Sequence, residues 1–216
     1  MPNPLFSSMK QSILDGDSDV AVTLAQQALA ENLDPLEAIN LGFLPGMNEI
    51  GEQFGSGHLF LPDVIMAAEA LKKATSILQP EMNRRGTQRE VMGKVVLGTV
   101  KGDVHEIGKS LVGTLLSASG FEVFDLGVDV PFEAFAKKAR EVKADIVGVS
   151  ALLTTTMTGQ KQVIAVLENA GLRPQVKVMV GGAPVTRGWA NEIGADGYSE
   201  DALGAVQMAK KLMGKF

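Results

Sequence analysis

The stretch GTVKGDVHEIGKSLVGTLLSAS, residues 98–119, joins a strand pattern to a helix pattern. An apolar run at 95–100 ends in a short polar loop that contains Asp103 and His105. Apolar residues then recur at helical spacing, which predicts a helix whose buried face is made of Ile107, Leu111, Leu115 and Ala118. The stretch therefore predicts a strand, a loop and a helix in direct succession, with a histidine in the loop.

His105 stands two residues after Asp103 and close to the start of the predicted helix. This placement suits a neutral imidazole that binds a ligand through one ring nitrogen, while the carboxylate accepts a hydrogen bond from the other. A loop histidine that is merely solvated is the plainer alternative for an isolated Asp-x-His triplet. His58 has no acidic neighbour placed to orient it, and we interpret it as a surface loop residue.

The chain from residue 89 to 216 alternates short apolar runs with helical patterns. The predicted strands are 95–100, 122–126, 146–150, 176–180 and 197–198. The predicted helices are 106–119, 132–143, 156–170, 186–194 and 200–214. Strict βα alternation predicts a parallel sheet with helices on both faces. We expect an α/β domain of five parallel strands, doubly wound and flavodoxin-like.

The segment 1–88 reads as helices only and predicts a four-helix bundle that forms a separate domain. Asp34 and Pro35 mark the start of the third helix, and Pro45 inside its pattern predicts a kink or break. The predicted buried faces of helices two to four are Val20, Leu24, Ala28 and Leu29; Leu36, Ile39, Phe43, Met47, Ile50 and Phe54; and Val64, Ala68, Leu71, Thr75 and Leu78. The polar stretch 83–90 predicts a linker.

Composition narrows the classes of partner. The chain of 216 residues has a net charge of -5 and no basic cluster, which argues against nucleic acid and anionic membranes as partners. It has no cysteine, so disulfides, thiolate metal sites and cysteine nucleophiles are excluded. No apolar stretch approaches the ~20 residues of a membrane span, and no signal peptide is evident at the N-terminus. We expect a cytoplasmic protein.

Polar and glycine-containing segments follow four of the five predicted strands. They are Gly102 to His105, Ser150 to Thr156, Gly181 to Pro184, and Tyr198 to Glu200. In an open parallel sheet, ligands bind beyond the carboxyl ends of the strands. The shared location therefore predicts a ligand crevice, although each segment alone is also compatible with a turn or a helix cap.

The motif D-x-H-x-x-G at Asp103, His105 and Gly108, followed by S-x-L at Ser150 and Leu152 and by Gly181-Gly182, resembles the cobalamin-binding domain of corrinoid methyl-transfer proteins and methionine synthase. Residues 43–64 resemble the helical cap that precedes this domain there. The likeness covers nearly the whole chain, whose size is that of the free-standing, two-domain corrinoid proteins of cobalamin-dependent methyltransferase systems.

The resemblance implies that the cofactor is cobalamin, as methylcobalamin or a related corrinoid, and that His105 is the lower axial ligand of its cobalt. It implies that Asp103 hydrogen-bonds His105 and that Ser150 hydrogen-bonds Asp103, and these three are the implied catalytic residues. The corrin would lie over the loop and the nucleotide tail would enter a slot beside the sheet. The implied cofactor contacts are Gly102, Val104, Glu106, Ile107, Gly108, Leu152, Thr154, Gly181, Gly182, Tyr198 and Ser199.

The resemblance also implies that the bundle covers the upper face of the corrin. Phe60 and Leu61 are then the candidates for contact with it. Met47 and Phe54 stand behind them, and we interpret these two as ordinary bundle core. The bundle would have to swing aside for the corrin to meet its partners, which predicts a hinge in the 83–90 linker.

The implied function is that of a methyl carrier, one component of an enzyme system and not a complete enzyme. It would accept a methyl group on cobalt from a substrate-specific methyltransferase and pass it to a second methyltransferase that acts on tetrahydrofolate or a thiol; a reductive activase is a further implied partner. A cobalamin-dependent sensor or regulatory module is the alternative. A phosphoacceptor signalling domain would need an aspartate where Ser150 stands, and the subunit of a radical mutase would not need the cap.

Overall fold

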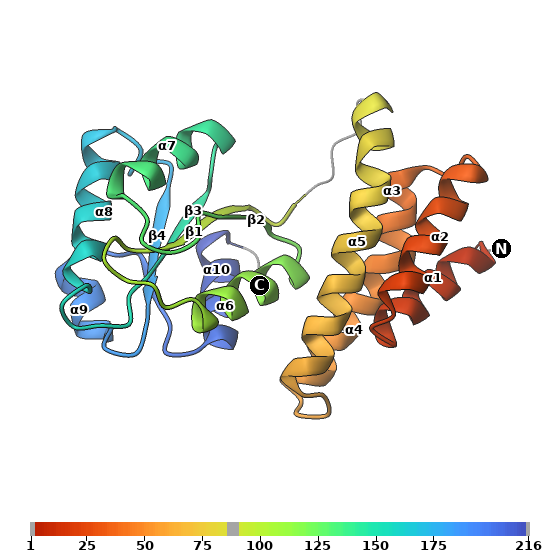
Figure 1. Ribbon diagram of the computed structural model, residues 1–216, viewed down its shortest axis with the longest axis horizontal. Coiled ribbons are helices and arrows are strands. Elements are labelled where there is room, and N and C mark those ends of the chain that lie inside the picture. Colours follow the sequence, from red (N-terminus) through yellow and green to blue (C-terminus); the bar gives the residue numbers. More distant parts are fainter. Residues whose placement is uncertain (1–2, 86–90, 215–216) are drawn as a thin grey trace. The chain divides into compact units, whose positions relative to one another are not determined.

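The computed structural model describes residues 3–85 and 91–214. The chain divides into two compact units, Met1–Glu90 and Val91–Phe216, the first helical and the second α/β (Figure 1). None of the helices in the described ranges is long and apolar enough to cross a membrane.

The first unit is a bundle of helices joined by short turns. Its elements are α1 (Pro4–Leu14), α2 (Ser18–Ala30), α3 (Pro35–Glu37), a π-helical segment η1 (Ala38–Phe43), α4 (Leu44–Gly55) and α5 (Leu61–Arg85). The side chains of Asn3, Asp17 and Asp34 cap α1, α2 and α3 by accepting hydrogen bonds from free amides of the first turn. The helix starts predicted at 17–18 and 34–35 are therefore confirmed.

The predicted break at Pro45 takes the form of a change in helix type. The chain passes from α3 into the π-helical segment η1, which ends at Phe43, and Pro45 lies in the first turn of α4. Proline is tolerated there because the first amides of a helix have no partner within it. The chain therefore stays helical from Pro35 to Gly55, and Ile39, Phe43, Met47 and Ile50 are buried as predicted.

The helix α2 packs against α5, and its buried residues are alanines, which corrects the predicted face in part: Ala28 is buried as predicted. The buried residues of α2 are Ala21, Ala25 and Ala28, and those of α5 include Ala67, Ala70 and Ala74. Val20, predicted to be buried, is exposed. Alanines at a helix contact let the two backbones approach closely. The prediction instead followed the larger apolar residues of the same helix, which made the spacing of the alanines hard to recognise in the sequence.

The helix α5 extends into the predicted linker, so residues 83–85 are helical. Glu81 pairs with Arg84 and Arg85 at 2.6 Å each, one helical turn away, and positive charge in the last turn suits the helix dipole. These hydrogen bonds lower the pKa of Glu81 to about 2. The rest of the predicted linker and hinge, residues 86–90, lies outside the described residues.

The second unit is a five-stranded parallel sheet with helices on both faces. Its strands are β1 (Lys94–Thr99), β2 (Glu122–Asp125), β3 (Ile146–Ser150), β4 (Lys177–Gly181) and β5 (Gly197–Tyr198). Its helices are α6 (Ile107–Ala118), α7 (Phe132–Val142), α8 (Thr158–Asn169), α9 (Arg187–Glu192) and α10 (Ala202–Leu212). The strand order β2-β1-β3-β4-β5 is the flavodoxin-like order, which confirms the predicted fold class.

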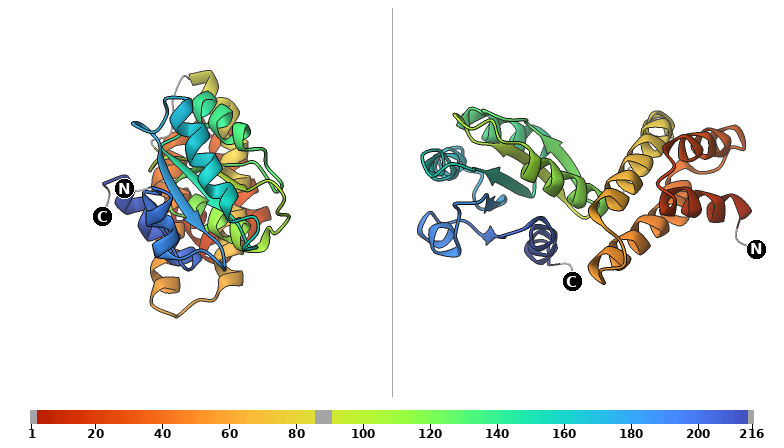
Figure 2. Two further views of the ribbon diagram at one scale, coloured as in Figure 1. Left: turned by 90° about the vertical axis from the view of Figure 1, so that its left-hand side faces the viewer. Right: turned by 60° about the horizontal axis from the view of Figure 1, so that its bottom comes forward.

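The two faces of the sheet are covered differently. On one face α7, α8 and α9 pack on an apolar core that includes Val147, Phe135 and Leu167 (Figures 1 and 2). On the other face α6 and α10 lie side by side. The order of the strands reverses between β1 and β3, which makes the carboxyl ends of these two strands the topological switch point where open sheets bind ligands.

Candidate functional site

The histidine loop, defined here as residues 100–106, connects β1 to α6 at the switch point. The loop after β2 fixes its first half, because Asp129 Oδ1 accepts the Gly102 N–H at 2.7 Å and the Asp129 N–H donates to the Asp103 carbonyl at 2.9 Å. Gly102 has a φ of 85°, a value that glycine adopts without strain. The loop is thus held by backbone hydrogen bonds and not by its own side chains alone.

His105 is held at its backbone and at its ring. The Thr99 hydroxyl donates to the His105 carbonyl at 2.9 Å. The carboxylate oxygen Oδ1 of Asp103 accepts the His105 N–H at 3.0 Å and lies 2.8 Å from ring nitrogen Nδ1. The Asp103 side chain is 0% exposed, whereas that of His105 is 47% exposed. The ring is therefore oriented by a buried carboxylate, while its other nitrogen is free of this contact.

The second oxygen of Asp103 is bound by the loop that follows β3. It accepts the Leu152 N–H at 2.8 Å and the Thr156 hydroxyl at 2.7 Å. Ser150 was expected to make this contact, but among the described residues no hydrogen bond joins Ser150 to Asp103; the chain turns at 151–156 so that Thr156 reaches the carboxylate instead. Burial would raise the pKa of Asp103, but hydrogen bonds from Leu152, Thr156 and His105 outweigh it and hold that pKa well below its usual range.

An apolar slot of about 740 Å³ opens next to the histidine loop. It lies on the sheet face covered by α6 and α10, between these helices and β1, β3 and β4. Ten of the residues expected at the cofactor line it, namely Val104, His105, Glu106, Ile107, Gly108, Ser150, Leu152, Gly181, Gly182 and Ser199. Residues from four separate segments of the sequence therefore line one continuous cavity.

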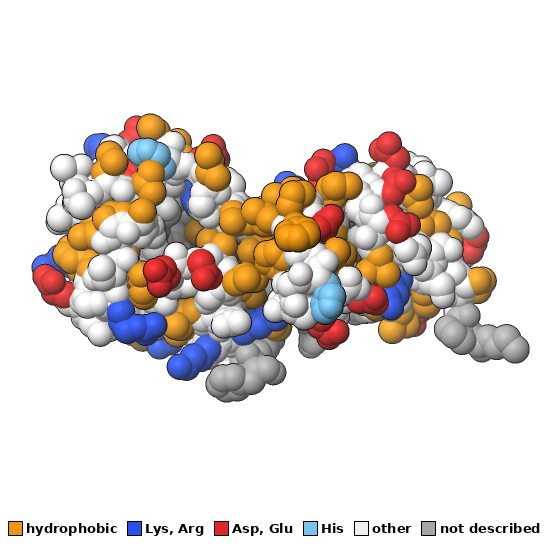
Figure 3. Space-filling model, turned by 90° about the horizontal axis from the view of Figure 1, so that it is seen from below, with side chains coloured by type: hydrophobic (Ala, Val, Ile, Leu, Met, Phe, Trp, Pro, Cys, Tyr) orange, Lys and Arg blue, Asp and Glu red, His pale blue; other side chains and the backbone are white. Residues whose placement is uncertain are grey.

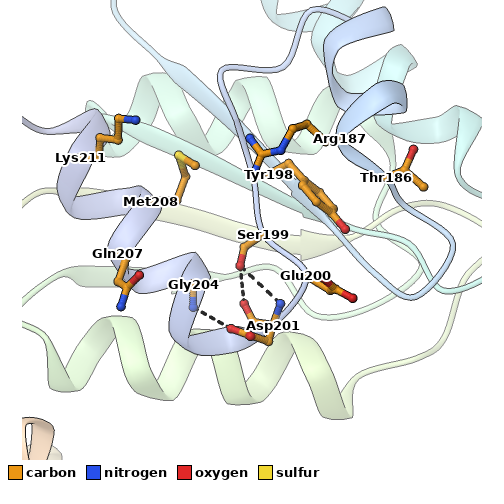
Figure 4. Close-up of a pocket in the computed structure, with 10 residues that line it drawn as sticks. All are labelled: Thr186, Arg187, Tyr198, Ser199, Glu200, Asp201, Gly204, Gln207, Met208 and Lys211. Carbon is orange, nitrogen blue, oxygen red and sulfur yellow. Dashed lines mark hydrogen bonds between the residues drawn. The ribbon is translucent and has the colours of Figure 1, made fainter. Parts of the chain in front are cut away.

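Six residues of the expected set lie elsewhere. Asp103 is buried behind His105, and Gly102 and Thr154 do not line the slot. Phe60 and Leu61 belong to the helical unit. Tyr198 lines a second, polar pocket of about 620 Å³, where the Arg187 guanidinium lies 5.8 Å from the centre of its ring (Figure 4).

Several lining residues of the slot have no distinctive sequence signal. Leu97, Gly148 and Met179 come from the strands, and Ala202 and Ala205 come from α10. These residues look like ordinary strand and helix core in the sequence. The exception is a glycine inside a strand, which often marks a place where a ligand or another backbone approaches closely.

Ile107 was predicted on the buried face of α6 but is 91% exposed, which is a correction. Val104 is exposed as well, and apolar side chains stand beside the histidine of this unit in Figure 3. The buried position of this helical turn belongs to Lys109. Exposed apolar residues that gather beside a cavity mark an interaction surface, so the rim of the slot is suited to an apolar partner.

Comparison with known proteins identifies the family to which the chain belongs. A B12-binding domain model matches residues 93–207, and a second B12-binding domain model matches residues 5–79. A corrinoid protein of Desulfitobacterium hafniense is 48% identical over 212 residues, which cover 98% of each chain. Trimethylamine corrinoid protein 1 of Methanosarcina acetivorans is 47% identical over 209 residues, which cover 97% of each chain.

A solved structure agrees with the sequence relatives. The chain is similar to the methanol:cobalamin methyltransferase complex of Methanosarcina barkeri, with a TM-score of 0.88 and 29% identity, over 100% of this chain and 82% of that one. The cofactor of the present chain is accordingly cobalamin or a related corrinoid, which contains cobalt. Both matched domains and relatives that span nearly its full length show that the chain belongs to the family of B12-binding corrinoid proteins.

Proposed function

We propose that this chain carries a methyl group on the cobalt of its corrinoid, from a substrate-specific methyltransferase to a second methyltransferase that acts on tetrahydrofolate or a thiol. The observation that carries the proposal is His105, half-exposed at the mouth of an apolar slot, with Nδ1 2.8 Å from a buried carboxylate. Similarity to trimethylamine and dimethylamine corrinoid proteins supports a methylated amine as the donor. It also favours the carrier over a cobalamin sensor.

The residues of the slot fit a corrinoid whose nucleotide tail enters the protein. Cavities of ~300–1,000 Å³ enclose most of a small ligand, and a slot of about 740 Å³ with mainly apolar walls suits a flat aromatic base. A Cβ at Gly108 would meet no atom within 4 Å, so the first turn of α6 leaves open space beside the slot. When bound, the corrinoid supplies a cobalt atom that takes up and releases a methyl group, a chemistry that no side chain provides.

In this proposal Asp103 determines which ring nitrogen of His105 carries the proton. Asp103 Oδ1 can only accept, because the carboxyl group is ionised, and we therefore assign the ring proton of His105 to Nδ1. Nε2 then keeps its lone pair for cobalt. A carboxylate behind a metal-binding histidine fixes the orientation of the ring and raises its basicity. Thr156 takes the supporting role that the resemblance had given to Ser150.

We further propose that residues 1–88 act as a cap domain and residues 89–216 as the cobalamin-binding domain. Phe60 and Leu61 remain the candidates for contact with the upper face of the corrin. Phe60 is 73% exposed, which is unusual for phenylalanine and leaves its ring available for a ligand. Met47 is buried in the bundle, as expected of a core residue. An apolar cover would exclude water from the cobalt.

The proposed ligand role of His105 is tested by the visible spectrum of the full chain after loading with hydroxocobalamin and desalting. We expect the wild type to retain cobalamin with a histidine-ligated, base-off spectrum, and His105→Ala to lose that spectrum. His58→Ala is the matched control, because His58 is exposed and its ring nitrogen Nδ1 lies 2.8 Å from the Ser56 hydroxyl, with no carboxylate hydrogen-bonded to it among the described residues. Identical spectra for the wild type and His105→Ala would contradict the ligand role.

The methyl-carrier role needs a partner in the assay. The cobalt of the loaded wild type is first reduced to Co(I) with an added low-potential reductant. Incubation with trimethylamine and a trimethylamine methyltransferase should then methylate the bound cofactor and release dimethylamine, and the visible spectrum of the cofactor reports the methylation. If methanol with its own methyltransferase does so and trimethylamine does not, the choice of donor is wrong while the carrier role stands. A chain that holds cobalamin but is methylated in neither assay would favour the sensor alternative.

The slot is tested with cobinamide, a corrinoid that lacks the nucleotide tail. The wild type should bind cobalamin at least about tenfold more tightly than cobinamide, because the slot buries the apolar base of the tail. Ala205→Phe fills the slot from α10 and should remove this difference. Leu203→Phe is the control on the same helix, since Leu203 is exposed and does not line the slot. If Ala205→Phe keeps the preference for cobalamin, the tail does not enter the slot.

A further inference from the structure

Lys109 is a buried charge that the proposed function does not use. Its side chain is 0% exposed, and it lies in the first turn of α6, four residues after His105. Lysine is almost never fully buried without a partner, and a positive charge near a helix N-terminus opposes the helix dipole. A side chain that is unfavourable on both grounds requires a compensating contact.

Asp125, at the end of β2, provides that contact. Both of its carboxylate oxygens contact the Lys109 ammonium, Oδ1 at 2.5 Å. Glu106 lies 3.7 Å away and adds a second negative charge. Asp125 Oδ1 also accepts the Gly127 N–H at 2.9 Å. One carboxylate therefore ties the start of α6 to the loop that follows β2.

The same loop holds the first half of the histidine loop. The Gly127 carbonyl accepts the Thr99 N–H at 3.0 Å, and Asp129 binds the backbone of Gly102 and Asp103. Lys109 thus binds Asp125, Asp125 binds the 126–129 loop, and this loop binds the histidine loop. The histidine loop leads directly into α6, which carries Lys109, so the contacts form a closed ring. His105 belongs to this ring of contacts. Its loop is held at one end through Asp129 and at the other end through the Lys109–Asp125 pair.

We propose that Lys109 and Asp125 are positioning residues that set where His105 Nε2 stands, and hence how much of the bound corrinoid is ligated by His105. This inference rests on the proposed function. A metal–nitrogen bond tolerates only small displacements of the ligand, so the elements that support it must be rigid. The ammonium of Lys109 is fully buried, whereas the side chain of Asp125 is 38% exposed. The pair gives such a support because the buried ammonium has no water molecule to take the place of Asp125, and a further backbone hydrogen bond holds the carboxylate.

Electron paramagnetic resonance of the full chain, labelled with 15N-histidine and loaded with cob(II)alamin, tests the inference. A ligated 15N-histidine splits the cobalt signal into doublets, whereas the unlabelled base of the cofactor would split it into triplets. In Lys109→Met we expect the ratio of histidine-ligated to unligated cofactor to fall about tenfold, the usual cost of losing an outer support of a metal ligand. Lys109→Arg should restore most of the ratio, and Asp125→Asn should add nothing in the Lys109→Met background. Lys94→Met is the matched control, since Lys94 pairs with Glu122 at the opposite end of β2.

The possible outcomes separate this inference from the function on which it rests. A wild type without nitrogen splitting would refute the ligand role of His105 itself. A wild type with splitting and an unchanged ratio in Lys109→Met would refute the positioning role and leave the function intact. If Lys109→Met weakened the binding of cobalamin but not of cobinamide and kept the ratio, Lys109 would act on the nucleotide tail, which also overturns the inference.

Discussion

Replacing Gly182 with alanine is expected to lower the free energy of unfolding of the α/β unit by more than about 3 kcal/mol. Gly182 follows β4 with a φ of 127°, a conformation that residues with a side chain rarely adopt. A Cβ there would overlap the carbonyl oxygen of Ala151 and lie 2.7 Å from its carbonyl carbon. Because these are backbone atoms at the end of β3, relief of the clash requires β3 and β4 to separate.

The chain offers a matched control and a local probe for this prediction. A Cβ at the neighbouring Gly181 would meet the Ser199 carbonyl oxygen at an ordinary 3.6 Å, so Gly181→Ala should stay within about 1 kcal/mol of the wild type. Trp189 is the one tryptophan of the chain and lies in α9. Urea unfolding followed by its fluorescence reports the α/β unit; equal midpoints for Gly182→Ala and the wild type would contradict the argument.

The alternation of strands and helices in the α/β unit was predictable because it depends on local patterns in the sequence. Each strand is a short apolar run and each helix begins after a polar or glycine-containing loop. The parallel arrangement follows from the alternation itself. The same topology brings the ends of β1 and β3 together, which is why Asp103 and Leu152 could be expected at one site from residues 49 positions apart.

The errors arose where exposure and contact depend on three-dimensional detail. Ile107 fits the apolar period of α6, but the period does not reveal that its turn lies at the rim of a slot, with Lys109 on the buried side. Ser150 and Thr156 are both hydroxyl residues after β3, and only the course of the loop decides which one reaches Asp103. The ion pair of Lys109 with Asp125 joins two elements whose pairing no local pattern encodes.

Replacing Asp103 with asparagine is expected to destabilise the α/β unit by about 2–4 kcal/mol at neutral pH. The carboxylate is an acceptor for every group that surrounds it: Leu152 and Thr156 donate to Oδ2, and His105 donates to Oδ1. The NH₂ group of asparagine would face a donor in either orientation, so at least one buried donor would lose its partner. The urea midpoint reported by Trp189 fluorescence measures the loss.

The loss should depend on pH in a defined direction. The pKa of Asp103 in the folded protein lies well below its usual range, because hydrogen bonds from Leu152, Thr156 and His105 outweigh the effect of burial. A carboxyl group of this kind stabilises the fold fully above its unfolded pKa, about 3.9, and less and less as the pH falls toward its folded pKa. The wild type should therefore lose stability more steeply than Asp103→Asn below about pH 4, and the two curves should converge.

Asp201→Asn is the control for the removal of a carboxylate that is not buried. Asp201 is an exposed N-cap whose Oδ1 accepts the Gly204 N–H at 2.7 Å, and asparagine caps a helix about as well as aspartate. Its stability should follow that of the wild type at neutral pH. If Asp103→Asn instead ran parallel to the wild type from neutral pH down to about pH 3, the acid sensitivity of the unit would come from other carboxylates. Protonation of the buried Asp103 carboxylate would then not be the cause of the loss of stability in acid.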